Sequence, residues 1–181
     1  MSIRRVSSRS VYENQWMKVR EDQIERADGS AGIYGVVEKP DFALIVPVDS
    51  DGGLWLVEQY RYPVEGRFWE FPQGSWEQQA GVEAAVLARG ELQEEAGLQA
   101  GSLRHVGHLY EAYGFSTQGF DVWLATDLQE VPASRDIEEQ DMRAQKIARD
   151  DWEAMVRDGE IKDAPSVAAY GLLVLSGLVE I

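Results

Sequence analysis

The sequence predicts an α/β protein, built as an α/β/α sandwich around a mixed sheet and preceded by an N-terminal antiparallel β-meander. Three observations support this prediction. Alternating or apolar segments of strand length recur along the chain and are separated by Gly, Asp and Pro turn signals. Three longer segments have helical periodicity. No repeat and no linker divides the 181 residues, so we expect a single domain over residues 1–181.

The composition excludes several classes of protein. A hydrophobic content of 44% with 10% aromatic residues is incompatible with general disorder. The apolar runs are too short to cross a bilayer, and the first five residues lack the apolar core of a signal peptide. The chain has no cysteine, which suits a cytoplasmic location, and its formal charge of −15 argues against nucleic-acid binding. We therefore expect a cytoplasmic protein that binds neither nucleic acid nor a membrane.

The N-terminal segment, residues 1–39, has the pattern of a β-meander. Asp28 and Gly29 supply the turn before its last strand. The expected strands are residues 3–11, 16–26 and 31–38.

Residues 40–181 are expected to form the core of the domain. The dense apolar run over 41–48 indicates a buried central strand. Pro165 suits the first turn of the last helix, and Gly159 ends the helix before it. In chain order we expect strands at 41–48, 54–60 and 68–71, a helix at 82–98, strands at 103–112, 119–126 and 142–148, and helices at 150–157 and 163–176.

Three carboxylates close the helix at 82–98. Glu91, Glu94 and Glu95 fall within a sector of roughly 100° at helical spacing. The helix dipole makes acids unfavourable at this end, and like charges at i,i+4 repel. A hard cation such as Mg²⁺, which prefers oxygen ligands, would offset both costs. The alternative is a solvated acidic helix face that ends with Gly97 as a left-handed cap.

These residues resemble a known motif. Residues 74–98 resemble the Nudix box, whose pattern is Gly, five residues, Glu, seven residues, then Arg-Glu-Leu-x-Glu-Glu-x-Gly-Leu. Gly74 corresponds to its opening glycine. The span from there to Glu91 is two residues longer than the pattern, and the pattern's Arg falls on Gly90, with Arg89 one place early. The closing part matches at Glu91, Leu92, Glu94, Glu95, Gly97 and Leu98.

The resemblance implies a Nudix-like fold, a metal site and a set of catalytic groups. The implied metal is Mg²⁺, with Mn²⁺ as an alternative, and the implied orienting residue is Arg89. Glu94 and Glu95 are expected to serve catalysis directly, and an acidic loop before the last strand offers Glu138 or Glu139 as the base. The expected metal ligands are the Gln73 carbonyl, Glu91, Glu94 and Glu95.

A second segment resembles one subgroup of that family, the ADP-ribose and nucleotide-sugar pyrophosphatases. It is the run from Glu58 to Arg61, Glu-Gln-Tyr-Arg, whose arginine lies near substrate phosphates in the subgroup. The subgroup also implies that the meander forms a homodimer. The aromatic, Gly-rich loop over 113–118 suits contact with a base or sugar. The expected substrate-binding residues are Arg61, Arg67, Glu70, Tyr113 and Phe115.

The predicted function is Mg²⁺-dependent hydrolysis of the pyrophosphate bond in ADP-ribose or a nucleoside diphosphate sugar, giving a nucleoside monophosphate and a sugar phosphate. One alternative is a diphosphatase acting on dinucleoside polyphosphates or oxidised nucleotides. Another is a nucleotide-binding sensor with impaired catalysis, which Gly90 keeps open. The loop over 113–118 lacks the proline that ADP-ribose-specific members tend to carry, so base and sugar stay open.

Overall fold

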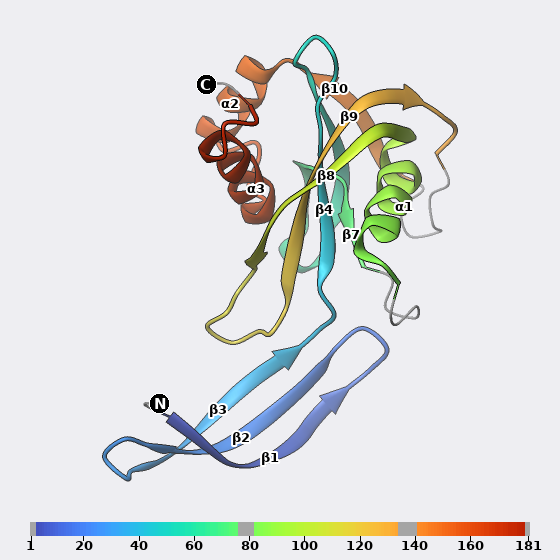
Figure 1. Cartoon of the computed structure of the whole chain (residues 1–181). Helices are drawn as coiled ribbons and strands as arrows, with labels where there is room; N and C mark the ends of the chain where they lie inside the picture. The colour runs from blue at the N-terminus through green and yellow to red at the C-terminus, as the bar shows by residue number, and fades with distance from the viewer. Residues whose placement is uncertain (1–2, 76–81, 134–140, 180–181) are drawn as a thin grey trace. The chain divides into compact units, whose positions relative to one another are not determined.

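The structure is a computed structural model that describes residues 3–75, 82–133 and 141–179 (Figure 1). The chain forms two compact units. The first joins residues 1–41 to residues 110–120, and the second joins residues 42–109 to residues 121–181.

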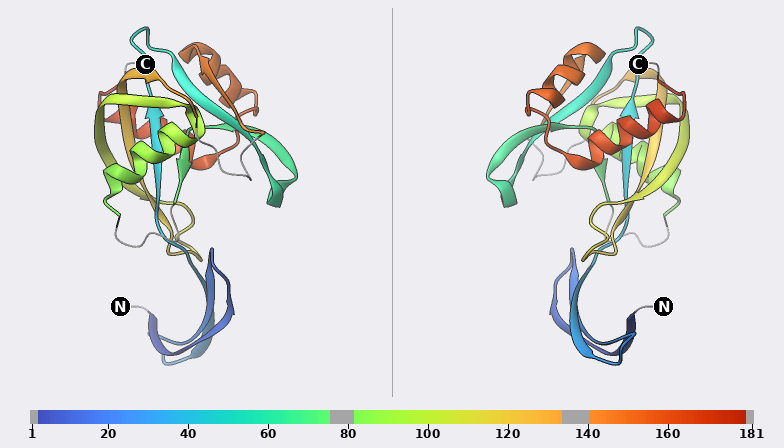
Figure 2. Two further views of the ribbon diagram at one scale, coloured as in Figure 1. Left: turned by 90° about the vertical axis from the view of Figure 1, so that its right-hand side faces the viewer. Right: turned by 90° about the vertical axis from the view of Figure 1, so that its left-hand side faces the viewer.

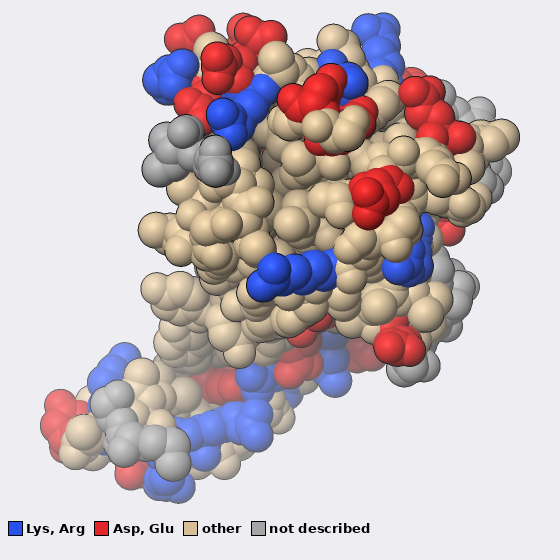
Figure 3. All heavy atoms as spheres, turned by 45° about the horizontal axis from the view of Figure 1, so that its top comes forward, with Lys and Arg blue, Asp and Glu red and all other residues tan. Residues whose placement is uncertain are grey.

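The first unit is a three-stranded sheet in the order β1-β2-β3, with both pairings antiparallel. This confirms the predicted meander. Its strands are β1 (Ile3–Glu13), β2 (Lys18–Arg26) and β3 (Ala31–Glu38). All of β1 is exposed, and ion pairs such as Arg4–Glu25 and Arg9–Glu21, both 2.9 Å, join it to β2. Figure 3 shows acidic and basic side chains interspersed over these strands.

The segment 110–120 is held against β3. The backbone N–H of Val37 donates to the Phe115 carbonyl at 2.8 Å, and the Thr117 N–H donates to the Val37 carbonyl at 2.9 Å. The Tyr34 hydroxyl donates to the Gly114 carbonyl at 2.7 Å. These bonds attach the aromatic loop to the meander.

The second unit contains two sheets, in the orders β7-β4-β9-β8 and β10-β5-β6. Figures 1 and 2 show α1 on one side of the strands and α2 and α3 on the other, which confirms the predicted sandwich. The strands are β4 (Phe42–Pro47), β5 (Leu54–Arg61), β6 (Gly66–Glu70), β7 (Gln73–Gly74), β8 (Leu98–Tyr110), β9 (Gly119–Glu130) and β10 (Arg143–Ile147). The helices are α1 (Ala84–Ala96), α2 (Arg149–Arg157), α3 (Ala164–Leu175) and the short 3₁₀ turn η1 (Tyr62–Val64).

Two apolar layers flank the strands of this unit. On the side of α2 and α3, Trp152 lies between Phe71 and Tyr170, with ring centroids 5.8 and 4.1 Å away. The layer beneath α1 consists of buried residues from the helix, from both sheets and from the position just before β10: Ala43, Ile45, Val57, Ala88, Leu92, Ala96, Leu98, Ala100, Trp123, Ala125 and Met142. The apolar face of α1 is therefore fixed against the sheets, which determines where its acidic residues lie.

Helix α1 ends as predicted but begins later. Gly97 has φ of 65°, and its N–H bonds back to the last turn, so it is the left-handed cap. The helix begins at Ala84 with Glu83 as N-cap, not at Val82. Strand β8 begins directly after the cap, at Leu98, five residues before the predicted start, because backbone pairing continues where the apolar pattern is weak. In the described part of the chain, no helix is long and apolar enough to span a bilayer.

Candidate active site

The last two turns of α1 direct two carboxylates inward. Glu91 is 5% exposed and Glu95 is 2% exposed, whereas Glu94 is only partly buried. A solvated acidic face would leave all three carboxylates in water, so that alternative is wrong for Glu91 and Glu95. A buried carboxylate is costly unless polar groups surround it.

The short strand β7 meets both carboxylates. The backbone N–H of Gln73 donates to Glu95 Oε2 at 2.9 Å. A Cβ on Gly74 would lie 2.3 Å from Glu91 Oε2, so any other residue there would force the Glu91 carboxylate to move. Gly74 thus allows the Glu91 carboxylate to pack directly on the backbone. The structure thus brings together Gln73, Gly74, Glu91 and Glu95, as the motif predicts.

The donor chemistry of this cluster suits a hard divalent cation. Glu91 and Glu95 offer carboxylate oxygens, and the absence of a Cβ on Gly74 lets the Glu91 carboxylate lie against the backbone of β7. Within residues 3–75, 82–133 and 141–179, no three His, Cys, Asp or Glu side chains are arranged as a ready metal site. A cation held by Glu91 and Glu95 would therefore need further ligands, and water and phosphate oxygens are the kind that Mg²⁺ accepts.

Arg61, at the end of β5, lies close enough to Glu95 to interact with its charge and is held by Glu70. Its Nε donates to Glu70 Oε2 at 3.0 Å, and its Nη2 donates to Oε1 of the same carboxylate. Burial opposes the cation, but Glu70, with Glu95 and Asp163, raises the pKa of Arg61. The Arg61 side chain is 40% exposed, so a fixed cation faces solvent near Glu95.

Glu70 itself is enclosed. Its side chain is 2% exposed and also accepts a 2.6 Å hydrogen bond from Gln59 Nε2. Burial raises the pKa of Glu70, and the Arg61 cation opposes that shift. The contacts of Glu70 therefore hold Arg61 in place, and contact of Glu70 with substrate stays a prediction.

Two further arginines have structural contacts. Arg67 Nε donates to Glu58 Oε2 at 3.1 Å, and Arg67 also pairs with Asp141, so it ties β6 to β5 and to the segment before β10. Arg89 Nη1 donates to the Ala100 carbonyl at 2.7 Å. On a helix Arg89 is roughly 160° from Glu91. The observed bond of Arg89 thus joins α1 to β8, and its role in orienting a glutamate stays a prediction.

The remaining predicted residues lie elsewhere. Glu138 and Glu139 are outside the described residues, so their role as base stays a prediction. Tyr113 and Phe115 belong to the first unit, where their side chains are 83% and 59% exposed. Their contact with substrate also stays a prediction.

The sequence analysis missed two residues of α3. Asp163 caps the helix, accepting from the Ser166 N–H at 2.8 Å, and the same oxygen accepts from Gln73 Nε2 at 3.1 Å. The Ser166 hydroxyl accepts from the Phe71 N–H at 2.8 Å. A helix-cap pattern was visible in the sequence, but no local signal pairs it with residues about ninety positions away.

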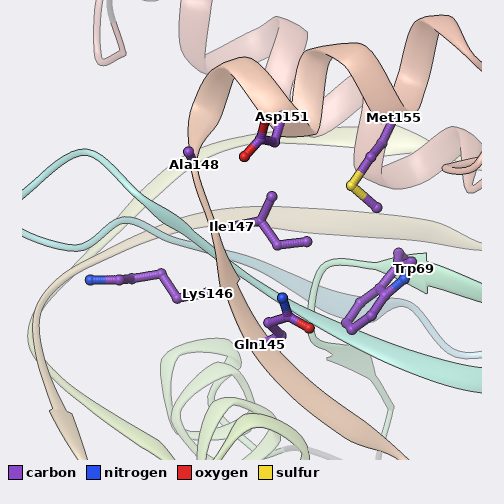
Figure 4. Close-up of a pocket in the computed structure, with 7 residues that line it drawn as sticks. All are labelled: Trp69, Gln145, Lys146, Ile147, Ala148, Asp151 and Met155. Carbon is purple, nitrogen blue, oxygen red and sulfur yellow. The ribbon is translucent and has the colours of Figure 1, made fainter.

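A separate hollow of about 370 Å³ lies between β6, β10 and α2. Figure 4 shows Met155 of α2 and Trp69 of β6 on its walls, with Lys146 pointing aside. Lys146 Nζ is bound to Asp49 and Asp51 at 3.2 and 2.8 Å. None of the predicted site residues lines this hollow.

Comparisons with known proteins match both parts of the chain. A family model described as the NUDIX domain matches residues 38–160, and one described as the nucleoside diphosphate sugar hydrolase N-terminal domain matches residues 3–37. An ADP-ribose pyrophosphatase of Mycobacterium tuberculosis (strain ATCC 25618 / H37Rv) is 36% identical over 126 residues, which are 70% of this chain and 60% of that protein.

Two further similarities extend over nearly the whole chain. An ADP-ribose pyrophosphatase of Bacillus subtilis (strain 168) is 25% identical over 171 residues, covering 94% of this chain and 91% of its own length. A solved structure titled as an ADP compounds hydrolase covers 99% of this chain and 98% of its own, with a TM-score of 0.84 and 21% identity. At 21% identity, the similarity to this solved structure shows a shared fold and nothing more.

Proposed function

Because this chain belongs to the Nudix family, we propose that it is a pyrophosphohydrolase that cleaves a nucleoside diphosphate joined to a sugar. ADP-ribose is the first candidate substrate, since two relatives are named ADP-ribose pyrophosphatases. The match of residues 3–37 to the N-terminal domain of nucleoside diphosphate sugar hydrolases favours the same substrate class over dinucleoside polyphosphates.

The observation that carries this proposal is the pair of buried carboxylates on α1, Glu91 and Glu95, which contact the backbone of β7. Glu91 and Glu95 would hold the cation, Mg²⁺ in our proposal, with Glu94 and the Gln73 backbone beside them. When bound, the cation draws charge from the diphosphate and makes phosphorus more open to attack. Without it, a chain of net charge −15 would repel an anionic substrate.

Arg61 supplies the fixed positive charge. Glu70 accepts from its Nε and Nη2, and no described residue accepts from Nη1, so in our proposal Nη1 faces a phosphate oxygen. Because the guanidinium is planar and already held at one edge, little side-chain entropy is lost when it meets the substrate.

The proposed reaction is a hydrolysis. The oxygen of water forms a bond to one phosphorus, and the bridging P–O bond breaks with its electron pair on the leaving phosphate. The proton of water passes to a base, for which the sequence offers Glu138 or Glu139. The products are a nucleoside monophosphate and a sugar phosphate.

The meander is proposed as the dimerisation element. Its first strand is exposed over its full length, and Val6, Val11 and Tyr12 on that strand are about half exposed. A second copy would cover such apolar surface. Light scattering coupled to gel filtration tests this directly, because a monomeric mass at working concentration would contradict it.

A substrate panel tests the proposed activity. ADP-ribose, GDP-mannose, UDP-glucose, a dinucleoside polyphosphate and an oxidised nucleoside triphosphate are each incubated with protein and Mg²⁺, and the products are separated by chromatography. We expect monophosphate from at least one of the first three. Absence of turnover for all five rejects the enzyme, and nucleotide binding without product identifies a sensor.

A further inference from the structure

The start of α3 forms hydrogen bonds with residues 71–73, the segment that leads into β7. Ser166, which is fully buried, accepts from the Phe71 N–H at 2.8 Å. Asp163 Oδ2 accepts from Gln73 Nε2 at 3.1 Å while capping its own helix. Pro72, which lies between Phe71 and Gln73, is also fixed, because its carbonyl accepts from the Ile45 N–H at 2.9 Å.

This segment is the support of the carboxylate pair. The Gln73 N–H donates to Glu95 Oε2, and Gly74 is the surface on which Glu91 rests. A shift of Gln73 therefore moves a hydrogen-bond donor of one glutamate and the packing surface of the other. Groups that hydrogen-bond to a metal ligand without contacting the metal commonly affect metal affinity and activity strongly.

We propose that Asp163, at the start of α3, is a positioning residue that fixes Glu95 through the Gln73 side chain. The expected effect on catalysis rests on the proposed function. The connection from Asp163 through Gln73 to Glu95 rests on the observed hydrogen bonds alone. Asp163 caps α3, whereas Gln73 lies in β7 and Glu95 in α1. The bond from Gln73 to Asp163 therefore connects α3 to the candidate active site. Its carboxylate also helps to hold Arg61 as a cation.

Two variants break the Asp163–Gln73 bond from opposite sides. Asp163→Ser keeps a good N-cap but is too short to reach the Gln73 amide. Gln73→Met keeps the backbone N–H and the side-chain length but removes the amide donor. Asp163→Asn retains an oxygen acceptor and serves as the rescuing variant. Val167→Ala, on the same turn of α3 and without a polar contact in the linkage, is the control.

Three readouts apply to the full chain. Amide hydrogen exchange of Gln73, followed by NMR, reports its bond to Glu95 directly; Mn²⁺ titration by calorimetry reports ligand geometry; steady-state kinetics on ADP-ribose separates kcat from KM. We expect Asp163→Ser and Gln73→Met each to weaken Mn²⁺ affinity and lower kcat about tenfold or more, with little change in KM. Exchange of the Gln73 amide should accelerate in both variants.

The double variant decides the linkage. If both residues act through one bond, Asp163→Ser combined with Gln73→Met is no worse than either alone. Additive losses, or Gln73 exchange and Mn²⁺ affinity unchanged in Asp163→Ser, overturn the proposal. So does failure of Asp163→Asn to restore them. If wild-type protein turns over no substrate, the proposed function fails, and the exchange rates still decide the role of Asp163.

Discussion

Replacing Gly74 by alanine tests the contact on which the candidate site is built. The new Cβ would stand 2.3 Å from Glu91 Oε2, whereas ordinary contact begins near 3.4 Å. The Glu91 carboxylate must therefore withdraw by about 1 Å. A displacement of that size at a catalytic group costs about 100-fold in rate.

The effect on stability should be small, because the colliding atoms are the flexible end of a side chain. We expect the free energy of unfolding to fall by about 1 kcal/mol. For a chain of 181 residues this lowers Tm by about 2–4 °C. Gly74→Ala should thus lose activity while remaining folded.

The assay combines kcat on ADP-ribose, Mn²⁺ affinity and Tm for each variant. The matched control is Gly171→Ala, since a Cβ there meets nothing within 4 Å and the site lies inside α3. It should keep full activity and a Tm no lower than wild type. In a Glu91→Gln background, Gly74→Ala should cause little further loss of rate. Wild-type turnover and Mn²⁺ affinity in Gly74→Ala would refute this account of Glu91.

Two more predictions concern the pair that Arg61 and Glu70 form. Arg61→Lys cannot both hold Glu70 at two points and face a phosphate, so steady-state kinetics should show KM raised about tenfold; an unchanged KM would mean that Arg61 serves only Glu70. Burial raises the pKa of Glu70 above its ordinary 4.5, so the folded chain keeps a proton that the unfolded chain has lost. The contribution of Glu70 to the free energy of unfolding therefore falls as pH rises from 4.5 through the raised pKa. Denaturant titrations from about pH 4 to pH 7 should show that the difference in this free energy between wild type and Glu70→Gln decreases with pH.

The sequence predicts the features that depend on neighbouring residues. The meander strands, the Gly97 cap and the proline in the first turn of α3 all follow from local backbone preferences. Grouping of Glu91 and Glu95 on one helix face follows from helical spacing, and their burial follows from the apolar stripe beside them. Such features need no knowledge of the tertiary structure.

Other features depend on contacts between distant segments. Asp163 and Gln73 are 90 positions apart, and an N-cap pattern does not show which second partner its carboxylate meets. The pairing of Arg61 with Glu70 depends on the register of β5 against β6, which the sequence leaves unspecified. The bond of Arg89 to the Ala100 carbonyl likewise depends on where β8 lies beside α1, which the local sequence does not specify.

The most direct test of the whole account is ³¹P NMR of ADP-ribose incubated with Mg²⁺ and either wild-type protein, Glu95→Gln or the exposed control Glu160→Gln. We expect wild type and Glu160→Gln to replace the diphosphate resonances with two monophosphate resonances in equal amounts, and Glu95→Gln to do so slower by orders of magnitude while still folded. A Glu95→Gln protein that cleaves at the wild-type rate would contradict the claim that this carboxylate holds the cation that hydrolysis requires.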